Sequence, residues 1–107
     1  MKETVPAPVP APVPAESAMP ARTLTICNRR GLHARAAAKF VKTCETFEAD
    51  VAVEKDGQSV GGLSIMGLMM LGAHPGAQIT VSAEGADAEA ALDALQALVE
   101  AGFHETD

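Results

Sequence analysis

The sequence contains no Trp, no Tyr and only three Phe among its 107 residues. So few aromatic rings leave little surface on which nucleic-acid bases could stack. Positive charge is also scarce, because eight Lys and Arg face fourteen Asp and Glu and give a formal net charge of −6. A nucleic-acid binder gains much of its affinity by neutralising phosphates, so this acidic balance argues against nucleic acid as a partner.

Cysteine is equally rare, with Cys27 and Cys44 the only two in the chain. Two cysteines so far apart form neither a disulfide framework nor a CxxC metal clip. No apolar run approaches the ~20 residues that a membrane-spanning helix needs, so we expect no membrane insertion. The length then allows one small domain, which we expect to be soluble and cytoplasmic.

Proline is concentrated at the start of the chain, where residues 1–20 hold six of the seven prolines in a near-repeat of Val-Pro-Ala-Pro. Proline removes backbone donors and favours extended polyproline II, so we expect residues 1–20 to be a disordered Pro/Ala-rich tail. The prolines also interrupt the apolar stretch that a secretory signal requires. Docking of the tail to a PxxP-type receptor is a minor alternative.

Globular patterning begins at Ala21. Alternating polar and apolar residues predict three half-buried strands, and the Asp56-Gly57 turn predicts a hairpin that adds a fourth, over residues 23–27, 51–53, 59–60 and 78–83. Apolar residues at helical spacing predict helices over 34–47, 64–71 and 88–102, the second capped by Ser64 and the third by Asp87. The order β-α-β-β-α-β-α predicts an α+β fold, a two-layer open-faced sandwich in which a four-stranded antiparallel sheet carries three helices on one face.

Charge is distributed unevenly within this domain. Residues 29–42 contain five of the eight basic residues and no acid, whereas residues 84–107 contain seven acids and no Lys or Arg. One interpretation is simple solubility, and the other is a cationic surface that attracts an anion or an acidic protein partner. The second is favoured because His33 lies at the centre of the basic segment, which holds Arg29, Arg30, Arg35, Lys39 and Lys42.

His33 is expected where a strand and a turn lead into a helix. The first N–H groups of a helix lack intrahelical partners and the helix dipole is positive there, so this end can hold an anion. The same positive end disfavours imidazolium, which we expect to keep His33 neutral and nucleophilic. Arg35 can fold its guanidinium over phosphoryl oxygens in a bidentate grip. His74 and His104 have no metal-ligand spacing with His33 or the cysteines, so we expect no metal and no cofactor.

The segment from Gly31 to Val41, Gly-Leu-His-Ala-Arg-Ala-Ala-Ala-Lys-Phe-Val, strongly resembles the active-site signature of HPr, the histidine phosphocarrier family of the bacterial phosphoenolpyruvate phosphotransferase system. A second block between Gly57 and Gly72 is similar to the family's regulatory-serine region, at the expected separation from the histidine. The resemblance covers residues 22–102. It divides the chain into the tail, an HPr-like phosphocarrier domain over 21–103 and a C-terminal fringe over 104–107.

The resemblance implies roles for three residues. His33 matches the histidine that phosphorylated enzyme I phosphorylates at Nδ1, and Arg35 matches the arginine that stabilises the phosphoryl group. Ser64 matches the serine phosphorylated by HPr kinase/phosphorylase in lineages that possess this enzyme, although by sequence pattern alone Ser64 is an ordinary helix N-cap. Ala36 departs from the family, which usually has Pro there. Because Ala is an excellent helix former, we expect the chemistry to be intact.

The implied function is that of a phosphocarrier, a co-substrate rather than an enzyme, which passes a phosphoryl group on His33 from enzyme I to a histidine of an enzyme IIA component. We expect a monomer that docks through the basic residues near His33 and through an adaptable apolar patch on the short helix, formed by Ile65, Met66 and Met69. Helical spacing also makes Ile65, Leu68 and Leu71 the expected core residues of that helix.

A competing interpretation is a regulatory binding module that keeps the fold and acts by contact alone, with phosphorylated Ser64 as its switch. The presence of His33 together with Arg35 argues against it. An independent hydrolase or kinase is disfavoured because the sequence has no Gly-rich phosphate loop, metal cluster or general-base pair. Sugar uptake and a nitrogen-type regulatory branch both stay open as settings, and the Ala-rich, acidic composition weakly favours the second.

Overall fold

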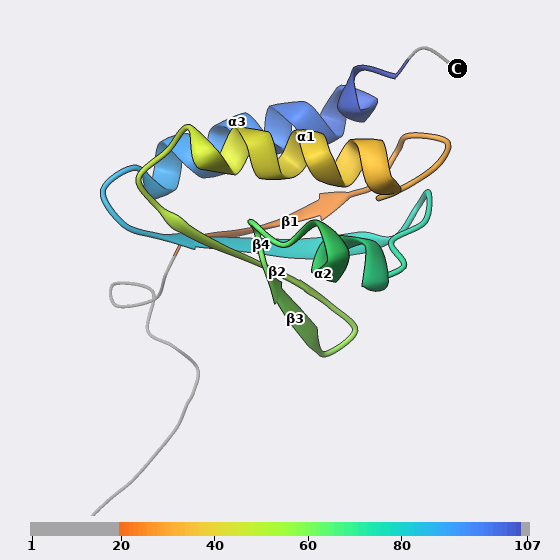
Figure 1. Cartoon of the computed structure of the whole chain (residues 1–107), viewed down its shortest axis with the longest axis horizontal. Helices are drawn as coiled ribbons and strands as arrows, with labels where there is room; N and C mark the ends of the chain where they lie inside the picture. Colours follow the sequence, from red (N-terminus) through yellow and green to blue (C-terminus); the bar gives the residue numbers. More distant parts are fainter. Residues whose placement is uncertain (1–19, 106–107) are drawn as a thin grey trace, which may run out of the picture.

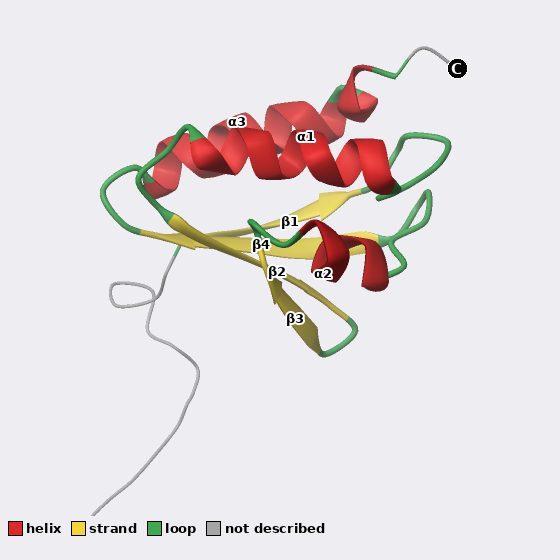
Figure 2. Ribbon diagram, in the orientation of Figure 1, coloured by secondary structure: helices red, strands yellow, loops and turns green. Residues whose placement is uncertain are grey.

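The computed structural model describes residues 20–105, so all but the last residue of the expected tail of residues 1–20 lies outside the described part of the chain. Strands and helices follow one another in the order β-α-β-β-α-β-α, and a short 3-10 helix comes after them (Figures 1 and 2). The elements are β1 (Ala21–Thr25), α1 (Ala34–Glu45), β2 (Asp50–Lys55), β3 (Gln58–Gly61), α2 (Ile65–Met70), β4 (Gln78–Glu84), α3 (Ala88–Glu100) and η1 (Gly102–His104). The expected open-faced sandwich is confirmed.

The strands form one antiparallel sheet in the order β1-β4-β2-β3. β4 lies in the interior of the sheet, between β1 on one side and β2 on the other, where Val53 pairs with Val81. β2 and β3 form the predicted hairpin around Asp56 and Gly57, whose φ angles of 51° and 83° suit a tight turn that needs two positive φ values. The last strand in the sequence therefore joins two parts of the sheet that do not pair with each other.

The helices form the second layer. α1 and α3 lie side by side across one face of the sheet, and α2 packs against α1 and β3 (Figure 1). α1 buries Ala37, Phe40, Val41 and Cys44, as their spacing predicts, and it also buries Ala36. Phe47, expected on the same face, lies beyond the end of the helix and is half-buried. α3 likewise buries Ala88, Ala91, Leu92, Leu95, Leu98 and Val99. Each fully buried Leu or Phe stabilises the fold by about 1.5–3 kcal/mol, so this interlayer core is the main source of stability.

Two element boundaries differ from those expected. β1 covers residues 21–25 rather than 23–27, because pairing with β4 stops at Thr25. Ile26 is fully buried, as an apolar strand residue should be, but its N–H donates to Ala77 O in the loop just before β4. α1 ends at Glu45 rather than 47, where the Thr46 hydroxyl donates to Thr43 O at 2.7 Å and satisfies a terminal carbonyl.

Asp87 precedes α3 as expected, but its side chain does not cap that helix. Its Oδ2 instead accepts a hydrogen bond from Glu48 N–H at 2.8 Å, and its own N–H donates to Glu48 O at 3.0 Å. Asp87 therefore ties the start of α3 to the loop between α1 and β2. The capping pattern placed the helix start correctly and assigned the carboxylate to the wrong partner.

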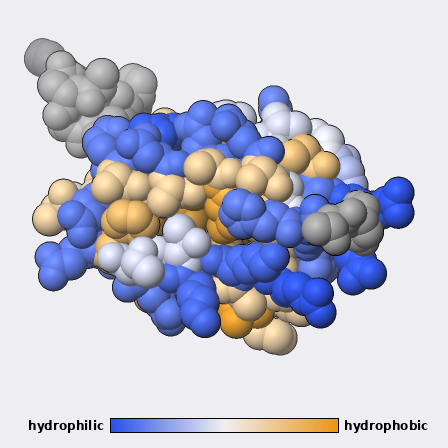
Figure 3. Space-filling view, turned by 90° about the horizontal axis from the view of Figure 1, so that it is seen from above, coloured by the Kyte–Doolittle hydropathy of each residue, from blue (hydrophilic) through white to orange (hydrophobic). Residues whose placement is uncertain are grey.

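The helix side of the molecule is not uniformly polar. Seen from above, hydrophobic side chains fill a strip between hydrophilic borders (Figure 3). A shallow groove of about 420 Å³ lies between α1 and α3 and is lined by Lys39, Lys42, Thr43, Thr46, Phe47, Ala94, Leu98 and His104. None of the described helices is both long and apolar enough to cross a membrane.

Candidate functional site

The loop between β1 and α1 is held in a fixed shape by the loop that precedes β4. Gly31 adopts a φ of +65°, and a Cβ added there would lie 2.2 Å from Ala73 O. The next residue, Leu32, is buried and donates its N–H to the same carbonyl at 2.9 Å. A glycine is therefore required where the two loops touch. This contact fixes the position of His33 at the start of α1.

His33 lies directly before α1, as the sequence predicts, and is the N-cap residue of that helix. Its backbone is extended (φ −78°, ψ −178°), its carbonyl accepts from Ala37 N–H at 2.8 Å, and its side chain makes no capping bond to the helix. The side chain is 22% exposed, so solvent and partner groups reach it. The first turn of α1 contains no acidic residue. The first turn of α1 thus brings no negative charge of its own to the place where an anion would bind.

The basic residues around His33 are mostly open to solvent. Arg29, Arg30, Arg35 and Lys42 are exposed, and Lys39 is half-buried. Within residues 20–105 no hydrogen bond or ion pair involves the Arg35 guanidinium, which leaves it available to a bound anion. Lys39 is different, because its Nζ donates to Phe103 O at 2.5 Å. The basic segment therefore offers exposed cations for a partner together with one that holds the C-terminal segment.

Glu105 is the residue of this site that the sequence did not reveal. Its Oε2 lies against Nε2 of His33, and its Oε1 accepts from Asn28 Nδ2 at 3.0 Å. The hydrogen bonds from His33 and Asn28 hold the pKa of the Glu105 carboxyl below its usual range. The expected C-terminal fringe of 104–107 begins at His104, the last residue of η1, and the described part of the chain runs on to Glu105. His33 and Glu105 lie 72 positions apart in the sequence, so no local sequence pattern indicates their contact. The only sign is an acidic residue that follows the last predicted helix.

Ser64 is the N-cap of α2 and its side chain performs the expected capping. Its Oγ accepts from Gly67 N–H at 2.9 Å, and the residue is exposed. A hydroxyl in this position is reachable by a modifying enzyme, although the hydrogen bond alone also explains why a serine stands here.

α2 and the residue before Ser64 present an exposed apolar patch, which we call the α2 patch: Leu63, Ile65, Met66, Met69 and Met70. The expected exposure of Met66 and Met69 is confirmed. Ile65 is predicted both in this patch and in the core; it is 40% exposed, which agrees with the patch and shows that the core assignment is wrong. Leu68 and Leu71 are buried as predicted. Contiguous exposed apolar side chains of this kind are typical of protein interaction sites.

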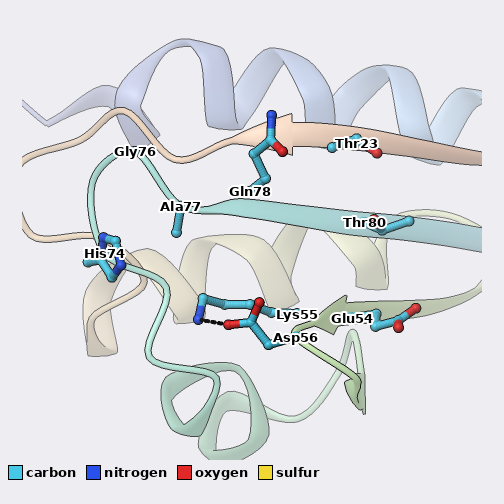
Figure 4. A pocket seen from close by; sticks show the side chains of 9 residues that line it. All are labelled: Thr23, Glu54, Lys55, Asp56, His74, Gly76, Ala77, Gln78 and Thr80. Carbon is cyan, nitrogen blue, oxygen red and sulfur yellow. Dashed lines mark hydrogen bonds and ion pairs between the residues drawn. The ribbon is translucent and has the colours of Figure 1, made fainter.

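A separate polar hollow of about 620 Å³ lies beside the β2–β3 hairpin (Figure 4). It is lined by Thr23, Glu54, Lys55, Asp56, His74, Gly76, Ala77, Gln78 and Thr80. Lys55 Nζ lies 2.8 Å from Asp56 Oδ2, and this bond lowers the pKa of the Asp56 carboxyl. Since its lysine is already paired, the hollow offers an anionic ligand much less than the start of α1 does.

Neither a metal centre nor a reactive buried thiol is found among the described residues. No group of three His, Cys, Asp or Glu side chains among them could hold a metal ion. Both cysteines are free, and burial raises the pKa of the Cys44 thiol to about 12, which keeps it protonated near neutral pH. Among residues 20–105, His33 is therefore the main candidate for the chemistry.

An open-faced β-α-β-β-α-β-α sandwich that presents a histidine at a helix start, with an arginine two residues later, defines the class of small histidine phosphocarriers. Residues 20–101 match the family described as the PTS HPr component phosphorylation site. The chain belongs to the HPr family.

Curated relatives carry two names. The chain is 44% identical over 84 residues to the phosphocarrier protein NPr of Shewanella violacea, which covers 78% of this chain and 92% of the relative. It is 46% identical over 88 residues to the phosphocarrier protein HPr of Pseudomonas putida, covering 81% and 98%. Because relatives named NPr and relatives named HPr have similar sequence identity to this chain, the comparison does not separate the nitrogen-type branch from the sugar-uptake branch.

Solved structures agree with the fold. HPr-C-His from Thermoanaerobacter tengcongensis aligns with a TM-score of 0.79 at 46% identity, covering 83% of this chain and all of that one. HPr from Bacillus anthracis gives a TM-score of 0.74 at 46% identity, covering 78% and 99%. A structure described as an HPr dimer from T. tengcongensis also matches, with a TM-score of 0.65 at 48% identity, covering 77% and 94%. Fold similarity is thus compatible with more than one oligomeric state, and the expected monomer stays a prediction.

Proposed function

We propose that this chain accepts a phosphoryl group on Nδ1 of His33 from phosphorylated enzyme I and passes it to a histidine of an enzyme IIA component. The observation that carries the proposal is the placement of a partly exposed His33 as N-cap of α1, with no acid in the first turn. Nε2 already contacts Glu105, so Nδ1 is the ring nitrogen without a partner among the described residues. In this role the chain is a co-substrate of phosphotransferases and not itself an enzyme.

The chemistry needs little more than positioning and charge. A phosphoryl group on Nδ1 would lie near the N–H groups at the start of α1, and Arg35 can supply a bidentate contact to its oxygens. Phosphoryl transfer between two histidines depends mainly on alignment and on stabilising negative charge. Because the protonated ring is a good leaving group, the same site both takes up and gives away the group.

Recognition of partners would use two adjacent kinds of surface. Exposed Arg29 and Lys42 favour partners with acidic docking faces, and such encounters are fast and salt-sensitive. The α2 patch adds flexible apolar contacts, and methionine-rich surfaces adapt to several partners. The loop contact between Leu32 and Ala73 joins the His33 loop to the segment that follows α2.

The decisive experiment is incubation of the protein with enzyme I and phosphoenolpyruvate. We expect an acid-labile, base-stable phosphoryl group to appear on the wild type and to be absent from His33→Ala. Transfer onward to a purified enzyme IIA completes the relay. A wild-type protein that takes up no phosphoryl group would contradict the proposal and would favour a module that acts by contact alone.

Ser64 is proposed as a regulatory phosphorylation site. Phosphorylation adds about −1.5 to −2 charge at neutral pH, which would repel an acidic partner from the surface around α2. We expect Ser64→Asp to slow phosphorylation of His33 by enzyme I while the domain keeps its fold, because a carboxylate is tolerated at a helix N-terminus.

The matched control for this prediction is Ser64→Ala. It loses the capping bond to Gly67 and about 1 kcal/mol of stability, but it adds no charge and should be phosphorylated on His33 at the wild-type rate. Initial rates of phosphate incorporation at limiting enzyme I compare the three proteins. Equal rates for Ser64→Asp and the wild type would remove the regulatory role.

A further inference from the structure

The backbone after α3 returns to the start of α1 through an uncommon conformation. Gly102, Phe103 and His104 have φ angles of 64°, 58° and 59°. Residues other than glycine avoid this region, and they keep it only where the surrounding structure fixes them. Phe103 is fixed because its side chain is completely buried, and Lys39 holds its carbonyl from the side of α1. The position of the next side chain, Glu105, is therefore determined by the core.

Two hydrogen-bonding partners orient the Glu105 carboxylate. Asn28 is 95% buried. Its side-chain amide donates from Nδ2 both to Gly31 O at 2.8 Å and to Glu105 Oε1 at 3.0 Å. Both partners only accept, so the amide must turn its NH₂ group towards them, and its Oδ1 is left buried without a partner. The bond from Asn28 thus holds Glu105, whose side chain is only 10% exposed, against His33.

The contact between Glu105 and His33 also determines where the ring carries its proton. An ionised carboxylate only accepts hydrogen bonds, so the ring nitrogen that faces it must carry hydrogen. A neutral imidazole has one N–H, and with Nε2 facing Glu105 the lone pair must be on Nδ1. Within the described residues nothing else bonds to Nδ1, so its lone pair is available.

We propose that Glu105 is a positioning residue for His33, which fixes the ring as the Nε2–H tautomer and so directs phosphoryl transfer to Nδ1. This inference rests on the proposed phosphocarrier function and adds to it a residue from the end of the chain. In this role the Glu105 carboxylate acts through the His33 ring and not on the phosphoryl group itself.

The transfer step balances without moving a proton. The Nδ1 lone pair forms a bond to phosphorus while the donor N–P bond breaks and returns its electron pair to the donor nitrogen. Nε2 keeps its hydrogen, and the positive charge that develops on the ring lies beside the Glu105 carboxylate. In onward transfer the Nδ1–P bond breaks and its electron pair returns to Nδ1, so Glu105 stabilises the charged ring in both directions.

The test compares wild type with Glu105→Gln and uses Glu54→Gln as a control for removing one negative charge, because Glu54 is exposed on β2. A glutamine has one acceptor oxygen for the two donors, Asn28 and His33, so the ring loses its fixed partner. Nitrogen-15 NMR of the imidazole should show Nε2–H and an unprotonated Nδ1 in wild type and in Glu54→Gln, and a mixture of tautomers in Glu105→Gln. Transfer from phosphorylated enzyme I should slow about tenfold in Glu105→Gln alone, the factor expected for one charge-assisted hydrogen bond.

Two results would overturn this inference. A wild-type ring that carries its proton on Nδ1 would do so by itself, even if Glu105→Gln folded poorly. Identical tautomer spectra and transfer rates in wild type and a folded Glu105→Gln would do so as well. Both differ from failure of the proposed function, in which the wild type takes up no phosphoryl group, whatever the state of its ring.

Discussion

Gly31 is a single residue on which the geometry of the site depends, because it lies where two loops meet. Its φ of +65° is costly for other residues, and Ala73 O occupies the space that a side chain would need. The hydrogen bond from Leu32 to Ala73 lies next to this contact. Any displacement at Gly31 is therefore transmitted to His33, two residues further on.

Replacement of Gly31 by Ala should destabilise the domain by about 2–4 kcal/mol, because a positive φ and a backbone clash act together. The control is Gly57→Ala, which has a φ of +83° and nothing within 4 Å of an added Cβ, and should cost about 1 kcal/mol. Urea denaturation followed by circular dichroism measures both changes. Equal losses in the two variants would mean that the contact with Ala73 relaxes freely.

At this scale the sequence predicts what depends on neighbours along the chain. The N-cap position of Ser64 and the place of His33 before α1 are confirmed, because capping involves residues only three or four positions away. Glu105 was missed for the opposite reason: its approach to His33 depends on the length of α3, the buried Phe103 and the left-handed turn between them. None of these can be placed before the whole domain is packed.

α2 is the element in which stability and recognition are most clearly separated. Its six residues make fewer than two full turns, so one buried side chain, Leu68, fixes it to the core while several of the others face outwards. So short a helix is not stable by itself in water. Packing of Leu68 and the capping bond of Ser64 therefore stabilise the element that carries the α2 patch.

Truncation of a buried side chain of α2 should lower stability, whereas truncation of an exposed one should weaken binding to enzyme I. Leu68→Ala should lower the free energy of unfolding by about 2–5 kcal/mol through loss of packing and a residual cavity. Met66→Ala removes a side chain that is 70% exposed and should change stability by about 0.5 kcal/mol or less, while it weakens binding to enzyme I. Thermal denaturation and titration calorimetry with enzyme I separate the two effects. Unchanged binding by a folded Met66→Ala would remove this residue from the docking surface.

The error at Ile65 has the same origin as the division within α2. Helical periodicity identifies a buried face when it repeats over three or more turns, as it does correctly for α1 and α3. Over six residues several assignments of the buried face fit equally well, and the turn before α2 decides which one packs. The sequence therefore predicts the presence of α2 more reliably than it predicts which side of the helix packs against the core.

For the molecule as a whole, charge connects the end of the chain to the site. The acid-rich C-terminal part contributes Glu105 to a region otherwise dominated by basic residues, and Lys39 also contributes to keeping the pKa of Glu105 low. A carboxyl whose pKa is lower when folded binds protons more readily when unfolded. Its contribution to stability is thus complete above its ordinary value of 4.5 and is lost as the pH falls through the lowered value.

Wild type should therefore be more stable than Glu105→Gln near neutral pH, and the difference should shrink as the pH falls below about 4.5. Glu54→Gln, which removes an exposed charge on the sheet, should show no such convergence. Urea titrations at several pH values between 3 and 7 measure the differences. A constant difference across this range would show that Glu105 does not titrate with a lowered pKa in the folded protein.

The strand order β1-β4-β2-β3 has a consequence for how the protein is made. A nascent chain that has been translated only as far as the Pro75 turn possesses both outer parts of the sheet and lacks the strand that unites them. Up to that point the β2–β3 hairpin is the only strand pairing that the described residues can form. Completion of the sheet thus waits for β4, so nearly the whole polypeptide must leave the ribosome before the domain can close cooperatively.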